Sequence, residues 1–497
     1  MHNTNFKKIK NLIKSNLIFI IILTFGILLR LNNLDYPLLS DEPNRDYLIS
    51  RHIVEYKEFI SLGPNNGTLT NAKNSPLYNY FLASLLWVKD DLMFLTTMNF
   101  IFQIISLILI YIMTKKLFGK NIAVISSAFL SFGNIFLLQS VQIWQPYEMF
   151  FFLTLSVFFI FKAWETKRNI FLFISPIFFA AAIAMNMSSM AFAPSYFMGV
   201  YLATKHKKNN ISLILISALI FEIFVIGFNY TNQINGISTD HFWIQKPKEL
   251  FINILERSNT LLKTLNLSLL VGIFIIFLGS LKRSKYLLFS LFSFIFVSSL
   301  IQAILLPQHF YPVLPIFVIL ISQIIESLPL KPIVATIFIL IFYQGAQTIK
   351  PSLTNFDRLN AQKVLVDTIS KEVVDIKESE NYNSLNFFQF RFYDSPSVNF
   401  FTNDSKTADA FLWTGLEKNL NTKFTTVKDF DTESRYEVNN SDKYIFLVCR
   451  FYESEIKELN NCLSRFSLEN KDYLLKDKIV TNMYSHSIYL FKNMVTE

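Results

Sequence analysis

Charged residues and glycines are scarce in this chain of 497 residues. Only 17% of the residues are charged and only 12 are glycine, whereas 52% are hydrophobic. A soluble protein typically carries about 25% charged residues. The apolar residues gather in runs of about 18–20, which are long enough to cross a hydrocarbon core about 30 Å thick. The composition therefore excludes an ordinary soluble protein and predicts a polytopic membrane protein with α-helical spans.

The signatures of soluble enzymes are also missing. No glycine-rich phosphate loop follows a strand-like run, and the chain has neither a Walker lysine nor a serine nucleophile elbow. Its six histidines are scattered without metal-ligand spacing. We therefore expect no cofactor and no dedicated metal site. A divalent cation held by carboxylates and a phosphate is compatible with the sequence but is not indicated by it.

The apolar runs predict about eleven transmembrane helices. The N-terminal run follows the basic stretch MHNTNFKKIKNLIK and lacks a small-residue cleavage site, so we interpret it as a retained span and not as a signal peptide. Residues 75–88 form a run too short for a span, which predicts an interfacial or re-entrant helix. The predicted spans lie near residues 15–31, 92–114, 121–140, 147–163, 169–186, 190–204, 211–228, 261–280, 286–306, 309–326 and 332–348.

Basic residues concentrate on one side of the predicted membrane domain. If the N-terminus is cytoplasmic, the inner loops collect 17 basic and 2 acidic residues, whereas the other segments before residue 350 collect 10 basic and 13 acidic ones. This contrast is typical of multi-pass proteins and sets their orientation. We therefore expect an inner or plasma membrane protein surrounded by lipid. The basic excess belongs to this topology and does not indicate a nucleic-acid partner.

The predicted membrane domain, residues 1–349, has an outward loop at 32–91 that carries the interfacial helices. Residues 350–497 form a different kind of sequence, which predicts an extracytoplasmic α/β or α+β domain. Helical periodicity is present in LNAQKVLVDTISKEVVDI and ESEIKELNNCLSRF. Strands rich in β-branched and aromatic residues are predicted in SLNFFQFRFY, DKYIFLVCR, DYLLKDKIVTN and HSIYLFKN.

The two cysteines of the chain, Cys449 and Cys462, both lie in this C-terminal segment. In an outward, oxidising compartment they are candidates for a disulfide. Two buried free thiols are the alternative.

A charged stretch follows the first predicted span. The sequence LLSDEPNRDYLISRHI at 38–53 predicts a helix with Asp41 or Glu42 as its cap and Pro43 in its first turn. Asp41 and Arg45 are four residues apart and therefore share a face of this helix. One interpretation is a solvated interfacial helix with weak ion pairs. The other is a functional site at the outer rim of the membrane.

Other outer-rim segments also carry polar side chains. The stretch QIWQPYEM at 142–149 contains Glu148, PQHFYPVLP at 307–315 contains His309 and Tyr311, and NAKNSPLYNY at 71–80 contains Lys73. Aromatic residues at such a rim are usually interfacial anchors, and a lone histidine is usually structural. Glu222, inside an apolar run, is costly to bury and is a further candidate unless it lies close to the outer interface.

The ordered set of these elements resembles the polyprenyl-phosphate-sugar-dependent glycosyltransferases of the C-type membrane fold, including the protein O-mannosyltransferases and the bacterial aminoarabinose transferase. The resemblance covers roughly residues 15–350. It is carried by LRLNNLDYPLLSDEPNRDYLISRHIV, the GP at 63–64, NSPLYNYFLASLL, TKKLFGKNIAVISSAFLSF, QIWQPYEMFFFLTLSV and QHFYPVLPIFVIL. Its best motif is the Asp-Glu pair outside the first span, followed by the interfacial helix that begins with SPLY.

The resemblance implies an inverting transfer of a monosaccharide from a polyprenyl-phosphate carrier to an acceptor hydroxyl on the outer face of the membrane. The acceptor is a glycan, a lipid or a protein. Asp41 is then the general base, and Glu42 orients its neighbours or contacts the sugar. The donor phosphate and the rest of the substrate are assigned to Arg45, Arg51, Lys73, Glu148, His309 and Tyr311.

Two departures from the aminoarabinose transferase pattern concern the phosphate ligands. That pattern has a lysine beside the proline of the interfacial helix, where this chain has Ser75, and its Asp-Glu-x-Arg spacing is one residue shorter than DEPNR here. Aminoarabinose transfer to lipid A is therefore not expected. The added modules of the protein O-mannosyltransferases are also absent, so a protein acceptor has no specific support.

Two other functions are compatible with a polytopic chain. The first is a transporter or a flippase of lipid-linked sugars, but such proteins usually have broken spans and polar residues near the midplane. The second is a membrane scaffold without enzymatic activity, which leaves the clustered outer carboxylates unexplained. The sequence therefore favours the transferase.

Overall fold

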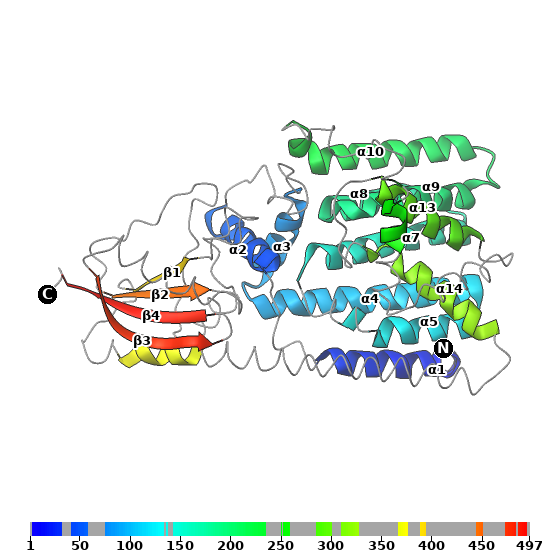
Figure 1. Cartoon of the computed structure of the whole chain (residues 1–497). Helices are drawn as coiled ribbons and strands as arrows, with labels where there is room; N and C mark the ends of the chain where they lie inside the picture. The colour runs from blue at the N-terminus through cyan, green and yellow to red at the C-terminus, as the bar shows by residue number, and fades with distance from the viewer. Residues whose placement is uncertain are drawn as a thin grey trace. The chain divides into compact units, whose positions relative to one another are not determined.

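The computed structural model describes the chain in two compact units, each built from separate stretches of sequence (Figure 1). The first unit comprises 1–37, 60–78 and 95–350, and the second comprises 38–59, 79–94 and 351–497. The described residues are 2–31, 41–57, 75–133, 136–137, 143–234, 250, 252–258, 285–300, 310–327, 366–375, 388–393, 444–450, 473–483 and 486–494.

The first unit is a bundle of helices. Helix α8 packs against both α7 and α10, and α5 packs against both α1 and α14. Figure 1 shows most of these helices running side by side. Their bounds are α1 His2–Leu31, α4 Leu92–Phe118, α5 Lys120–Phe132, α7 Gln145–Thr166, α8 Ile170–Met185, α9 Ala193–Thr204, α10 Asn210–Ile234, α13 Lys285–Ser299 and α14 Leu314–Ser327, with a 3-10 helix η1 at Met187–Phe192.

The helices follow the predicted spans closely. Helices lie within nine of the eleven predicted segments, and the remaining two, 261–280 and 332–348, lie outside the described residues. Among the described residues, α4 and α7 are long and apolar enough to cross a membrane, and seven further helices are apolar but shorter. The count of eleven spans therefore stays a prediction.

Apolar side chains cover outward-facing surfaces of the bundle. On α10, Ile211, Leu215, Leu219 and Ile223 are all more than half exposed and recur at every fourth residue, so they form one stripe along the helix. Such a stripe is unfavourable in water and favourable against lipid. Glu222 is also exposed, on the same helix beside this stripe.

The predicted span 121–140 is interrupted. Helix α5 ends at Phe132 because Gly133 takes an extended conformation, with φ −62° and ψ 132°. A β-carbon at Gly133 would lie 2.6 Å from the carbonyl oxygen of Phe129, so a larger residue does not fit there. Helical structure returns at residues 136–137. The single span expected here is therefore a shorter helix followed by a break.

Hydroxyl groups join four helices inside the bundle. Ser156 on α7 donates to the carbonyl oxygen of Ser175 on α8 over 3.0 Å, and Ser175 donates to the Ser156 carbonyl over 2.9 Å. The Ser175 hydroxyl also lies 3.3 Å from that of Tyr196 on α9, which lies 3.4 Å from that of Ser217 on α10. Small polar residues of this kind allow close packing of helices in lipid.

Two short helices precede α4. Helix α2 spans Asp41–Tyr56 and α3 spans Leu77–Val88. With 12 residues, α3 is about 18 Å long at 1.5 Å per residue, which is too short to cross a bilayer. This length agrees with the interfacial or re-entrant helix predicted for residues 75–88.

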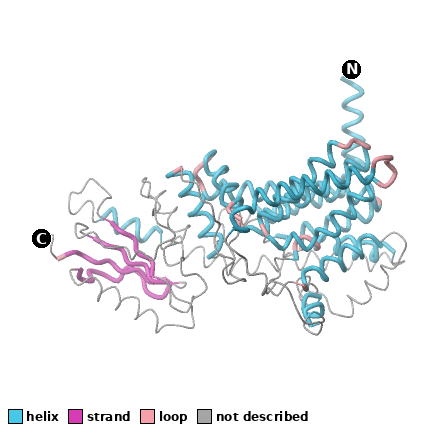
Figure 2. Tube along the Cα trace, turned by 90° about the horizontal axis from the view of Figure 1, so that it is seen from above, coloured by secondary structure: helices cyan, strands magenta, loops and turns pink. Residues whose placement is uncertain are grey.

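The C-terminal segment contains a four-stranded mixed sheet with the strand order β1-β2-β4-β3. The β1–β2 pair is parallel, and the β2–β4 and β3–β4 pairs are antiparallel. A helix over residues 366–375, with buried Val366, Ile369 and Val373, lies beside the sheet in both views (Figures 1 and 2). The strand bounds are β1 Phe388–Tyr393, β2 Tyr444–Arg450, β3 Tyr473–Met483 and β4 His486–Asn493.

All four predicted strands are confirmed in position, and the first predicted helix of this segment is confirmed over residues 366–375. The second helix, predicted at 453–466, lies outside the described residues. Cys449 lies in β2, but its side chain and the whole of Cys462 lie outside the described part of the chain. The disulfide, the domain boundary near residue 350 and the outward location of this segment therefore stay predictions.

Candidate active site

Helix α2 carries the acidic start that the sequence singled out. The helix begins at Asp41, one or two residues before the start predicted from an Asp41 or Glu42 cap, and Pro43 lies in its first turn. In helical spacing, positions 41 and 45 fall on a different face of α2 from the buried positions 46 and 50. The side chains of Asp41, Glu42 and Arg45 lie outside the described side chains, so their assigned roles stay predictions.

The buried face of α2 is fixed on α3 by polar contacts. Asp46 and Asn79 are both 0% exposed. The Asp46 carbonyl oxygen accepts a hydrogen bond from the Ser50 hydroxyl over 2.6 Å and another from Asn79 Nδ2 over 3.3 Å. The bond from Asn79 connects α3 to α2 at a buried contact, where an unmade hydrogen bond is costly, whereas the bond from Ser50 lies within α2. The Asn79 bond therefore helps to fix the position of the helix that starts at Asp41.

Arg51 is buried between two carboxylates. Its side chain is 1% exposed, and its Nε lies 2.8 Å from Glu55 Oε1 and 3.9 Å from Asp90 Oδ1. Glu55 is one turn further along α2, whereas Asp90 lies between α3 and α4. The Asp90 pair thus connects α2 to the chain after α3, whereas the Glu55 pair lies within α2. This geometry favours an anchoring role for Arg51, and the phosphate-binding role predicted for it stays a prediction.

The first turn of α7 brings a carboxylate into the interior of the first unit. Helix α7 begins at Gln145 after the extended Trp144, and Pro146 occupies its first turn. Glu148 follows in that turn and is 2% exposed. A negative charge is favourable there because the helix N-terminus carries a partial positive charge. The helix start therefore places a buried carboxylate at the positive end of a helix dipole.

Tyr311 lies close to this turn. Its ring is 5.2 Å from the ring of Tyr147, the residue before Glu148, and the two rings meet edge to face. Tyr147 is held in turn from α4, because Gln103 Nε2 donates to the Tyr147 carbonyl oxygen over 2.8 Å. Tyr311 itself belongs to a tight turn in which Val313 N–H bonds the Phe310 carbonyl. The structure thus brings the predicted residues Glu148 and Tyr311 to one place.

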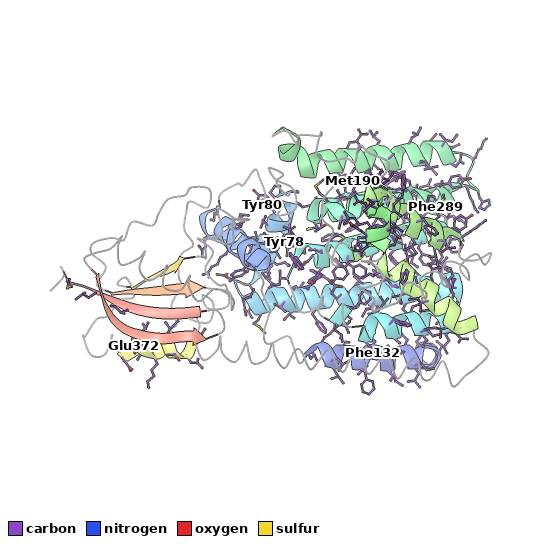
Figure 3. All side chains as sticks on the ribbon, viewed as in Figure 1. Tyr78, Tyr80, Phe132, Met190, Phe289 and Glu372 are labelled. Atoms are coloured by element: carbon purple, nitrogen blue, oxygen red, sulfur yellow. The ribbon has the colours of Figure 1, made fainter. Side chains whose placement is uncertain are left out.

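Ser75 replaces the lysine of the aminoarabinose transferase pattern and has a structural role here. Its hydroxyl accepts a hydrogen bond from the Leu77 N–H over 3.2 Å at the start of α3. Ser75 is 3% exposed, and Tyr78 in the next turn is fully buried. Figure 3 shows Tyr78 and Tyr80 on this helix. A lysine at position 75 has no acceptor oxygen for this bond.

The predicted site residues fall in both units. Asp41, Glu42, Arg45 and Arg51 belong to the second unit, and Glu148 and Tyr311 belong to the first. Lys73 and His309 lie outside the described residues. Among the side chains that the structure describes, no group of three or more His, Cys, Asp or Glu is placed to hold a metal ion.

Sequence reasoning missed two buried polar residues of the helical bundle. Arg30 on α1 is 1% exposed and Gln103 on α4 is 5% exposed, yet both lie in apolar helices. The sequence does contain a signal for both residues, because a charged or amide side chain within a membrane-spanning run needs a polar partner. The partners themselves were not readable, since Gln103 bonds a carbonyl 44 residues away.

Comparisons with known proteins agree with the resemblance stated from the sequence. Residues 73–228 match the family described as dolichyl-phosphate-mannose-protein mannosyltransferase. This stretch contains α3, α4, α5, α7, α8, α9 and most of α10. No curated protein matches the chain in sequence at a significant level.

Solved structures match nearly the whole chain. The crystal structure of ArnT from Cupriavidus metallidurans bound to undecaprenyl phosphate aligns over 95% of this chain and 97% of that protein, with 9% identity and a TM-score of 0.56. Its apo structure aligns over the same shares, with 9% identity and a TM-score of 0.55. The archaeal oligosaccharyltransferase AglB from Archaeoglobus fulgidus is more distant, with 10% identity, a TM-score of 0.44 and coverage of 92% and 72%.

The fold is therefore that of a C-type membrane glycosyltransferase, a multi-pass membrane fold. At 9% identity the match to ArnT establishes the fold alone. The predicted fold class is confirmed to that extent.

Proposed function

We propose that this protein is an inverting glycosyltransferase that moves a monosaccharide from a polyprenyl-phosphate carrier to an acceptor hydroxyl on the outer face of the membrane. The observation that carries the proposal is a helix that begins with Asp41 and Glu42 in a chain with the fold of ArnT. The ArnT structure contains undecaprenyl phosphate. A long-chain polyprenyl phosphate is accordingly the donor carrier proposed for this chain.

Asp41 is the proposed general base. It accepts the proton of the acceptor hydroxyl, and the freed oxygen attacks the anomeric carbon of the donor sugar. The bond between that carbon and the phosphate oxygen breaks, and the lipid phosphate leaves with the electron pair. Attack from the face opposite the phosphate inverts the anomeric centre. Because the phosphate is a good leaving group, positioning and charge stabilisation supply most of the catalysis.

Arg45 and Lys73 are the proposed ligands of the departing phosphate. Arginine is suited to this task because its planar guanidinium forms two parallel hydrogen bonds to phosphate oxygens. Arg51 is the weakest of the three predicted cations for this role, because Glu55 and Asp90 already lie against its buried Nε. We assign it to holding α2 in place.

Glu148, Tyr311 and His309 are the proposed donor-binding residues of the first unit. The contact between the Tyr147 and Tyr311 rings supports this grouping, since it fixes the turn before α14 against the first turn of α7. A buried carboxylate and tyrosine suit the hydroxyl groups of a sugar, which both donate and accept hydrogen bonds. Glu42 is assigned to orienting the residues around Asp41 or to contacting the sugar.

The proposal is tested by sugar transfer in membranes that contain the protein. A radiolabelled sugar on a short-chain polyprenyl phosphate is added, and label that leaves the lipid fraction for an acceptor is measured. We expect Asp41→Asn to lower this transfer by about 10²–10⁴-fold, the usual contribution of a general base. Asp375→Asn, the same change at an exposed helical position, serves as the matched control.

Two outcomes contradict the proposal. Full transfer by a folded Asp41→Asn variant rules out Asp41 as the base. Movement of an intact lipid-linked sugar across vesicles, without cleavage of the sugar from its phosphate, identifies the alternative flippase.

A further inference from the structure

Arg30 is the most deeply buried cation of the helical bundle that the structure describes. It is 1% exposed, in the last turn of α1, within the apolar run FGILLRL. A charged side chain in such a run is costly unless polar groups surround it. Arg30 meets this requirement with backbone carbonyl groups, since each of its four side-chain hydrogen bonds ends on a main-chain oxygen.

The guanidinium of Arg30 makes four hydrogen bonds. Nη1 donates to the carbonyl oxygens of Gly26 and Ser131 over 2.9 and 2.8 Å. Nη2 donates to those of Leu130 and Phe136 over 3.1 and 3.3 Å. Each terminal nitrogen carries two N–H groups, so each of these groups has a carbonyl acceptor. We name this arrangement the Arg30 clasp.

Three of these acceptors surround the break after α5. Leu130 and Ser131 lie in the last turn of α5, where backbone carbonyls lack helical partners, and Phe136 follows the extended Gly133. A helix broken in an apolar environment needs donors for these carbonyls. Arg30 supplies them from a helix about 100 residues earlier in the chain. The clasp thus provides hydrogen bonds to the carbonyl groups at the break and fixes the position of the break against α1.

The clasp fits its surroundings closely. A β-carbon at Gly26 would lie 3.0 Å from Ser131 Cβ and 3.1 Å from Arg30 Nη1, so Gly26 is needed for the approach of α1 to α5. Below it, Ile22 of α1 packs with Ala128 and Phe132 of α5. Figure 3 labels Phe132 in this contact between the two helices.

The segment held by the clasp packs on the first turns of α7. The Phe136 ring lies 6.5 Å from the ring of Phe150, and Phe150 is two residues after Glu148 on the same helix. Phe136 and Phe150 are both buried. The backbone of Phe136 is therefore fixed by Arg30 while its ring contacts the helix that carries Glu148.

We propose that Arg30 is a positioning residue for the donor-binding residues Glu148 and Tyr311. The clasp holds the broken end of α5, and that end sets the position of the first turn of α7 through Phe136 and Phe150. The terminal nitrogens of Arg30 are directed at carbonyls and not at a donor phosphate, which leaves the buried Nε as the one guanidinium nitrogen without a hydrogen bond. The inference rests on the proposed function for its effect on donor binding, and its structural part can be tested without activity.

Hydrogen–deuterium exchange of the purified full chain in detergent tests the structural part. In the structure, Gly133 N–H bonds Phe129 O and Leu137 N–H bonds Gly133 O, so these amides report on the break. We expect Arg30→Met to speed exchange in peptides covering 129–137 and 145–150 by about tenfold. Exchange over 170–185 in α8 is expected to stay unchanged. Unchanged exchange over 129–137, or an equal rise in every helix, overturns the clasp.

Donor titration in the transfer assay tests the functional part. We expect Arg30→Met to raise the KM for the donor by about tenfold, because misplaced binding groups weaken the bound geometry. The kcat at saturating donor should stay within about threefold, since Asp41 belongs to the other unit. Arg30→Lys, which keeps N–H donors, should restore part of the KM. A lower kcat at unchanged KM indicates only a loss of folded protein and overturns the positioning role.

Gly26→Ala provides a variant that keeps the guanidinium and tests the clasp if Arg30→Met does not fold. Its added methyl group crowds Arg30 Nη1, so we expect a smaller change of the same sign in exchange and in KM. Gly199→Ala is the matched control, because its β-carbon would meet Ile160 at an ordinary 3.5 Å. Arg168→Met, at an exposed arginine, controls for the loss of charge. Equal effects of Gly26→Ala and Gly199→Ala contradict the clasp.

The two tests separate this inference from the proposed function. If the wild-type protein transfers no sugar, the proposed function fails, and the exchange experiment still decides whether the clasp exists. If transfer occurs and the KM of Arg30→Met is unchanged, the positioning role fails and the proposed function stands.

Discussion

Arg30 and Arg51 are both 1% exposed, but their charges are compensated in different ways. Arg30 is surrounded by neutral carbonyls, whereas Arg51 faces the carboxylates of Glu55 and Asp90. Removing Arg30 leaves carbonyls without donors but creates no uncompensated charge. Removing Arg51 leaves two acids close together beside a buried helix face, which is a larger electrostatic cost.

Arg51→Met is therefore expected to destabilise the protein. Breaking a fully buried ion pair costs about 3–5 kcal/mol. Asp90 is 29% exposed, so water offsets part of this cost, and we expect a loss of about 2 kcal/mol, seen as a melting temperature lower by several degrees. Thermal unfolding in detergent measures it.

The control for Arg51→Met is Lys89→Met, whose ion pair with Asp91 is largely exposed and should matter by less than about 1 kcal/mol. An Arg51→Met variant with unchanged stability and a raised donor KM would instead assign Arg51 to the phosphate.

At the scale of helices and strands, the sequence predicted where each element lies better than where a helix breaks. The start of α2 was predicted because a cap and Pro43 mark it locally, and the four strands were predicted because alternation and β-branched residues extend over each one. The break after α5 was missed because a single glycine in an apolar run is tolerated within a membrane helix. Arg30 bonds the carbonyl groups at this break, and one of these bonds joins residues 106 positions apart, which no local pattern encodes.

For the candidate site, the sequence likewise predicted individual residues but not the contacts between them. Asp41, Glu148 and Tyr311 were chosen because polar residues at a membrane rim stand out in an apolar sequence. The role of Tyr147 as the link between Glu148 and Tyr311 was not predicted, because it requires the turn at Phe310–Val313 to meet α7 in space. Ser75 was treated as a departure from a pattern, and its bond to the Leu77 N–H was not foreseen.

The hydroxyl contacts between α7, α8 and α9 lead to a prediction for helix packing. Ser175→Ala removes the hydrogen bond that the Ser175 hydroxyl donates to the Ser156 carbonyl and the bond between the Ser175 and Tyr196 hydroxyls, so we expect a loss of about 1 kcal/mol. Tyr196→Phe removes one partner of the same network. The double variant should therefore lose less stability than the sum of the two single variants.

Unfolding in mixed detergent micelles measures this coupling. Ser84→Ala, whose hydroxyl bonds only within its own exposed turn, is the control and should leave stability unchanged. Strictly additive losses for Ser175→Ala and Tyr196→Phe would show that the hydroxyl groups do not act together.

At the scale of the whole molecule, the predicted membrane orientation can be tested with two residues on opposite sides. Five predicted spans separate Lys208 from the C-terminal segment, so the two must lie on opposite sides of the membrane. In a Cys449→Ser/Cys462→Ser background, Lys208→Cys and Met494→Cys each provide one exposed thiol. A membrane-impermeant maleimide on intact cells should label Met494→Cys at once and Lys208→Cys only after lysis. Labelling of both thiols in intact cells would contradict the predicted topology.

The order of strands in the sheet has a consequence for how the protein is made. Strand β4 is the last of the four in sequence, yet it lies between β2 and β3. A nascent chain that has not yet delivered His486–Asn493 therefore leaves the longest strand, β3, with no neighbour from this sheet. The sheet closes only after every preceding helix has left the ribosome. Closure of the sheet therefore waits for the synthesis of β4, and a premature stop before residue 486 removes one of the two inner strands.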